Sequence, residues 1–149
     1  MNDLHTIFAT AKTRTASQQF AYAGAVTPEE ALEILQKNTA AVLVDVRSKA
    51  ELDLVGRIPN AMHIEWASYP GMVANPAFAS QLQAAIPQDA CVIFMCRTGG
   101  RSHNAANVAA SLGYKQAFNM LEGFEGEANT MNQRTLINGW KHAGLPWSN

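Results

Sequence analysis

The order of its short apolar segments is the feature that most constrains the fold of this 149-residue chain. Largely apolar runs at 41–46, 90–96 and 116–121, and a further strand candidate at 58–64, alternate with segments whose apolar residues recur at helical spacing. The run "AVLVDV" is rich in β-branched residues, as expected for a strand that is covered on both faces. This order predicts an α/β fold with a mainly parallel sheet and helices on both faces.

Two capping boxes mark the positions where helices begin. Thr27 and Ser48 each precede a helical pattern, and Glu30 and Glu51 stand at the position that completes the box. A further helix is expected to begin near residue 101 or 102, in an alanine-rich segment that ends at Gly113. The helices therefore fall between the predicted strands, as a parallel sheet requires.

The first 24 residues are expected to form an N-terminal extension with a short helix, and residues 25–149 the main domain. One helical face of the extension carries its apolar residues, namely Leu4, Ile7, Phe8 and Ala11. The chain contains no secretory signal pattern and no apolar run of about 18 residues, so we expect a cytoplasmic protein without membrane association. Its net charge of −1 indicates no general affinity for nucleic acid.

The segment "CRTGGRS" carries the candidate chemistry. Cys96 ends a predicted strand, and ligands of parallel sheets bind outside the carboxyl ends of the strands. The helix that follows brings unpaired N–H groups and partial positive charge to that place, which favours a thiolate over a thiol. Cys96 is therefore the candidate nucleophile. The candidate substrate-binding residues are its neighbours Arg97, Thr98, Gly99, Gly100 and Arg101.

Other residues near the predicted site have more ordinary interpretations. Cys96 alone could be a buried core cysteine, but two glycines and two arginines in one loop argue against that. Asp45 and Arg47 end a strand on the same side of the sheet and could support the site, although a structural ion pair is favoured. In an extended segment Cys91 lies roughly 16 Å from Cys96, too far for a disulfide. The four histidines lack the spacing of a metal site.

Several blocks of the chain resemble the rhodanese sulfurtransferases. Besides "CRTGGRS", they are "TPEEALEIL", "LVDVR", "GRIPNAMHI", "NMLEGF" and "GWKHAGLPW", in the family's order. The resemblance implies a rhodanese-like five-stranded sheet and a single-domain thiosulfate sulfurtransferase. In such an enzyme Cys96 would take a sulfur atom from thiosulfate or another sulfane-sulfur donor as a persulfide. It would then pass the sulfur to cyanide, a small thiol or a protein thiol. The resemblance implies no metal or organic cofactor.

Departures from the family pattern leave the donor and the acceptor open. Arg57 stands where the family usually has histidine, Asn60 and Phe124 replace glycines, and the segment 124–139 is an insertion. A persulfide relay or sensor and a non-catalytic binding module remain alternatives to a sulfurtransferase. A cysteine phosphatase is disfavoured because only four residues separate Cys96 from Arg101, and phosphatases of this fold have a longer loop.

Overall fold

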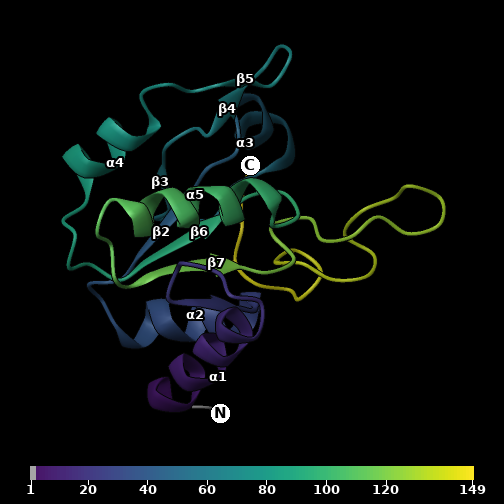
Figure 1. The fold of residues 1–149 in the computed structure, drawn as a ribbon. Coiled ribbons are helices and arrows are strands. Elements are labelled where there is room, and N and C mark those ends of the chain that lie inside the picture. Colours follow the sequence, from purple (N-terminus) through teal and green to yellow (C-terminus); the bar gives the residue numbers. More distant parts are fainter. Residues whose placement is uncertain (1–2) are drawn as a thin grey trace.

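The computed structural model describes residues 3–149, which form an α/β structure around a five-stranded sheet (Figure 1). The strand order is β1-β7-β6-β2-β3, and each pairing in it is parallel. These strands are β1 (Gly24–Val26), β2 (Val42–Asp45), β3 (Met62–His63), β6 (Val92–Met95) and β7 (Ala117–Met120). The predicted α/β fold with a parallel five-stranded sheet is confirmed.

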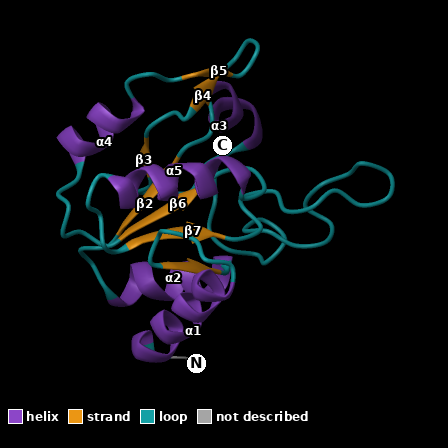
Figure 2. Cartoon of the chain, viewed as in Figure 1, coloured by secondary structure: helices purple, strands orange, loops and turns teal. Residues whose placement is uncertain are grey.

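Helices cover both faces of the sheet (Figure 2). The helices of the described residues are α1 (Leu4–Ser17), α2 (Pro28–Lys37), α3 (Lys49–Val55), α4 (Phe78–Ala85) and α5 (Gly100–Ser111). α4 and α5 contribute Phe78 and Ala105 to one core cluster, whereas α1 and α2 contribute Ile7 and Ile34 to the other. The sheet therefore separates two apolar cores.

Adjacent residues of the central strands point into different cores. Leu43 and Ile93 belong to the cluster beneath α1 and α2, while Val44 and Phe94 belong to the cluster beneath α4 and α5. All four side chains are buried. Because both faces are covered, a strand of this sheet has no polar face, which explains its continuous apolar sequence.

Both predicted capping boxes are confirmed. Thr27 and Ser48 each accept a hydrogen bond from the backbone of the glutamate that completes the box, and each glutamate side chain returns to the backbone of the cap. α5 begins at Gly100, slightly earlier than predicted. The reason is Gly99, whose left-handed backbone (φ 112°) turns the chain sharply into the helix.

The N-terminal segment packs onto the domain. α1 buries Ile7 and Ala11, and Arg14 forms an ion pair of 2.6 Å with Glu30 of α2. The strand β1 then pairs with β7, with Gly24 opposite Phe118. The sequence pattern did not identify β1 because it is only three residues long. The boundary between residues 24 and 25 stays a prediction.

The remaining segments lie around the carboxyl edge of the sheet. β4 (Ala67–Ser68) and β5 (Val73–Ala74) form an antiparallel hairpin. The segment 124–139 extends away from the sheet as the long loop at the right of Figure 1. None of the helices in the described part of the chain combines the length and the apolar character that a membrane crossing needs.

Candidate active site

Cys96 lies directly after β6, at the carboxyl end of the sheet and before the first turn of α5. The residue is only 1% exposed. The Gly99 backbone N–H donates a hydrogen bond of 3.1 Å to the Cys96 Sγ atom, and the Ser102 hydroxyl oxygen lies 3.3 Å from the same sulfur. This location agrees with the position inferred from the sequence; the role of Cys96 as a nucleophile is a proposal considered below.

The loop that carries Cys96 is held by the segment that follows β7. The Phe124 N–H donates to the Cys96 carbonyl over 2.8 Å, and the Glu125 N–H donates to the Arg97 carbonyl over 3.0 Å. Within the loop, Arg97 is partly exposed and Thr98 is exposed. The backbone of the loop is therefore fixed between α5 and the start of the long insertion.

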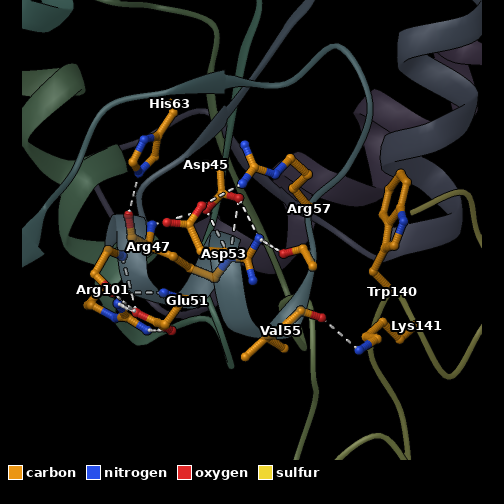
Figure 3. Close-up of polar contacts among 12 residues, drawn as sticks. Asp45, Arg47, Glu51, Asp53, Val55, Arg57, His63, Arg101, Trp140 and Lys141 are labelled. Carbon is orange, nitrogen blue, oxygen red and sulfur yellow. Dashed lines mark hydrogen bonds and ion pairs between the residues drawn. The ribbon is translucent and has the colours of Figure 1, made fainter. Parts of the chain in front are cut away.

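Both arginines of the loop have carboxylate partners. Arg101 donates from two nitrogens to the two oxygens of Glu51, over 2.7 and 2.9 Å, in a bidentate pair (Figure 3). Arg97 lies 3.6 Å from Glu125, and its side chain is 43% exposed. Arg101 is therefore committed to a structural contact, while Arg97 remains accessible to an anionic ligand.

Glu51 has two functions, because it caps α3 and also binds Arg101. Burial raises the pKa of the Glu51 carboxyl, but hydrogen bonds and charge from Arg101, together with hydrogen bonds from Ser48, outweigh it and lower the pKa below its usual value. A carboxylate whose pKa is lowered on folding stabilises the folded state above its unfolded pKa. That stabilisation is lost as the pH falls through the folded pKa.

Glu51→Gln should therefore destabilise the protein at neutral pH by about 1–3 kcal/mol, because the charge-assisted bonds to Arg101 are weakened. The difference from the wild type should shrink as the pH falls below the ordinary glutamate pKa of about 4.3, where the unfolded carboxyl takes up a proton, and it should vanish once the pH has fallen through the lowered pKa of the folded state. Urea unfolding at a series of pH values measures this difference. If the difference in the free energy of unfolding between wild type and Glu51→Gln stayed constant as the pH is lowered into the acid range, this explanation of the role of Glu51 would be wrong.

Asp45 and Arg47 form a buried ion pair beneath the loop, as favoured from the sequence (Figure 3). The closest contact joins Arg47 Nη2 to Asp45 Oδ2 over 2.7 Å, and the same nitrogen also donates to the Gly56 carbonyl. The Arg47 guanidinium carbon lies 4.2 Å from the centre of the Phe124 ring. Because the Phe124 N–H donates to the Cys96 carbonyl, the ion pair is linked to the Cys96 loop through Phe124.

Two buried polar residues beside Cys96 were missed as site residues in the sequence. The sequence pattern indicates Ser102 only as the start of a helix and Asn119 only as part of an apolar strand. In the structure the Ser102 hydroxyl donates to Asn119 Oδ1 over 2.6 Å, and both residues are buried. An asparagine within a strand buried on both faces needs a specific partner, and this is the signal that could have identified it.

The second cysteine is separate from the site. Cys91 precedes β6, so it lies at the other end of this strand from Cys96, and both thiols are free. Burial raises the pKa of the Cys91 thiol to about 11. Cys91 is therefore protonated and unreactive at neutral pH. Within residues 3–149, no group of three or more His, Cys, Asp or Glu side chains is arranged to hold a metal ion.

Comparison with known proteins shows which family has this architecture. Residues 27–129 match the sequence model of the rhodanese-like domain. This chain belongs to the rhodanese-like family. Its rhodanese-like domain includes the Cys96 loop, Glu51 and the Asp45–Arg47 pair, whereas α1 and β1 precede the matched region.

Related proteins include one with a named activity. The rhodanese-like chain is 37% identical over 120 residues to uncharacterized protein RP600 of Rickettsia prowazekii, a match covering 79% of this chain and 91% of that protein. It is 31% identical over 121 residues to the thiosulfate sulfurtransferase GlpE of Actinobacillus succinogenes, covering 81% and 86%. The crystal structure of Rv0390 from M. tuberculosis matches with a TM-score of 0.78 at 41% identity, covering 85% and 98%.

Proposed function

We propose that this chain is a sulfurtransferase that moves a sulfane sulfur from thiosulfate, or a similar donor, to a thiophilic acceptor. The observation that carries the proposal is the placement of Cys96, with its sulfur bound by the Gly99 amide at the start of α5. Such a position stabilises negative charge on a sulfur atom. The similarity to a thiosulfate sulfurtransferase supports the same chemistry.

The reaction follows from the chemistry of a cysteine nucleophile in two steps. The Cys96 thiolate attacks the outer sulfur of thiosulfate; the new S–S bond forms as the sulfur–sulfite bond breaks, and sulfite leaves with its electron pair. An acceptor nucleophile then attacks the outer sulfur of the Cys96 persulfide. This second step forms the bond from acceptor to sulfur and returns Cys96 as a thiolate.

A cavity of about 420 Å³ beside the loop offers a place for the substrates. Its lining combines charged and apolar side chains: Ala50, Glu51, Leu54, Val55, Tyr69, Arg97 and Glu125. The accessible Arg97 guanidinium suits an anionic donor. Thr98, Gly99 and Gly100 follow Arg97 in the loop and complete the proposed set of substrate-binding residues. The exposed Leu54 and Tyr69 suit the apolar part of an organic or protein thiol.

The proposal is tested by intact-mass spectrometry after brief exposure to thiosulfate. We expect the wild type to gain one sulfur atom, which cyanide or a small thiol then removes. Cys96→Ser should gain none, because an alcohol is a much weaker nucleophile at neutral pH. The matched control is Cys91→Ser, which should gain sulfur like the wild type because Cys91 is buried at the other end of β6.

Two results would contradict the proposal. One is a folded wild-type protein that gains no sulfur from thiosulfate, a polysulfide or an organic persulfide. The other is a gain of sulfur in Cys96→Ser equal to that of the wild type. Circular dichroism of each variant shows that a negative result does not come from unfolding.

A further inference from the structure

Two charged side chains of opposite sign lie next to each other at the cavity beside the Cys96 loop. Arg97 Nε lies 3.6 Å from Glu125 Oε2, and both residues line the cavity of about 420 Å³. The Arg97 side chain is 43% exposed, whereas that of Glu125 is only 15% exposed. The transfer steps proposed above use Arg97 to attract an anionic donor, but they assign no role to the carboxylate beside it.

The backbone of Glu125 is held on both sides. Its N–H donates to the Arg97 carbonyl over 3.0 Å, and its carbonyl accepts from the Thr135 N–H over 2.8 Å. The first bond ties Glu125 to the Cys96 loop, and the second ties it to the segment 124–139, which departs from the family pattern. The residue therefore has a defined place at the cavity, and its carboxylate is mostly buried there.

The charged groups of this cavity balance one another. Glu51, the other carboxylate of the lining, accepts from two nitrogens of Arg101 over 2.7 and 2.9 Å. Lys141 does not line the cavity, because its ammonium group donates to the Val55 carbonyl over 3.0 Å (Figure 3) and lies over the Trp147 ring. Among the described residues, the cavity therefore has no lining cation that lacks a carboxylate partner.

We propose that Glu125 is a specificity-determining residue, which makes the site favour sulfur donors with at most one negative charge over dianions such as thiosulfate. This inference rests on the proposed sulfurtransferase function. Arg97 attracts each negative charge of a donor and Glu125 repels it, so the pair leaves little net gain. A dianion still has the larger cost of leaving water. The class of donor that suits the site best is a neutral or singly charged organic sulfane-sulfur compound.

Two pairs of reagents isolate the effect of one negative charge at nearly constant size. Methanethiosulfonate differs from thiosulfate by a methyl group in place of one charged oxygen. The Cys96 thiolate takes the outer sulfur of either donor; the sulfur–sulfur bond of the donor breaks, and sulfite or methanesulfinate leaves with the electron pair. Iodoacetate and iodoacetamide alkylate the same thiolate and release iodide. Within each pair, the ratio of the two rate constants cancels the reactivity of Cys96 itself.

The test compares the wild type with Glu125→Gln, which keeps the size of the side chain and removes its charge. One ratio is the kcat/KM of thiosulfate over that of methanethiosulfonate, with cyanide as the acceptor. The other is the rate constant of Cys96 alkylation by iodoacetate over that by iodoacetamide, from mass spectrometry of the Cys96 peptide. We expect both ratios to rise about 3- to 10-fold at low ionic strength. Salt at about 1 M should shrink the rise by screening.

Glu127→Gln is the matched control for this variant. Glu127 belongs to the same segment and loses the same charge, but it is exposed and does not line the cavity. Its carboxylate accepts from Asn138 Nδ2 over 3.3 Å. Both ratios should stay within about 1.5-fold of the wild-type values, because water and salt screen a charge at this position.

Either ratio unchanged in folded Glu125→Gln would overturn the proposal, and so would an equal rise in Glu127→Gln. A distorted loop would slow both reagents of a pair and leave their ratio the same, so the expected rise is specific to charge. Should the glutamine variant not fold, Glu125→Ala removes the same charge. A wild type that takes no sulfur from either donor contradicts the proposed function instead; the alkylation ratio then still decides whether Glu125 selects by charge.

Discussion

Arg47→Met is expected to lower the free energy of unfolding by about 3–5 kcal/mol. The Arg47 and Asp45 side chains are 0% and 2% exposed, so the substitution leaves a carboxylate buried without its counter-charge. It also removes the bond to the Gly56 carbonyl and the cation that lies on the Phe124 ring. The loss therefore combines an unpaired charge with lost packing.

Urea unfolding of Arg47→Met and of a matched variant, Arg57→Met, measures this effect. Arg57 pairs with Asp53 over 2.8 Å, but both side chains are nearly half exposed. An exposed pair contributes little, so the control should lose no more than about 1 kcal/mol. Equal losses in the two variants would show that burial of the Asp45–Arg47 pair has no special effect.

Gly123→Ala is expected to reduce the rate of persulfide formation by about 100-fold, because it displaces the loop that positions Cys96. A Cβ atom at Gly123 would lie 2.6 Å from the Thr98 nitrogen and closer still to the Arg97 carbonyl oxygen. Both partners are backbone atoms, so the clash can be relieved only by moving the loop. Residue 123 also has a φ of +70°, which is unfavourable for alanine.

Gly144→Ala is the matched control for this variant. Gly144 has a φ of +75°, but a Cβ atom there would meet nothing within 4 Å. This control should lose about 1–2 kcal/mol of stability from backbone strain and keep the wild-type rate. Stopped-flow or quenched mass measurements of sulfur gain from thiosulfate give both rates. A wild-type rate in folded Gly123→Ala would show that the loop tolerates the displacement.

Local patterns predicted the parts of the fold that depend on neighbouring residues. The apolar run at 90–96 predicted β6, and the spacing of Thr27 and Glu30 predicted the start of α2. The position of Cys96 followed from where its strand ends and the next helix begins. Each of these inferences needs only a few consecutive residues, whose burial and backbone preferences are visible in the sequence.

Contacts between distant residues could not be predicted in this way. Glu51 and Arg101 are 50 positions apart, and Ser102 and Asn119 are 17 apart. The sequence shows a capping glutamate, an arginine in a loop and an asparagine in a strand, each with its own ordinary explanation. Only the packing of α3 and β7 around the start of α5 brings them together. It also changes the expected availability of Arg101 to a substrate.

Glu51 binds both the start of α3 and Arg101, and these two contacts determine which side of the cavity beside the Cys96 loop can open. One carboxylate caps the first turn of α3 and also binds Arg101 in the first turn of α5, so it links these two helix ends. On the opposite side, the side chains of Arg97 and Glu125 approach each other only to 3.6 Å, and both residues lie in connections outside the helices. If sulfur transfer is the function, as proposed above, we expect a bulky acceptor to enter by displacing the Arg97 and Glu125 side chains, while the α3–α5 side of the cavity keeps its shape.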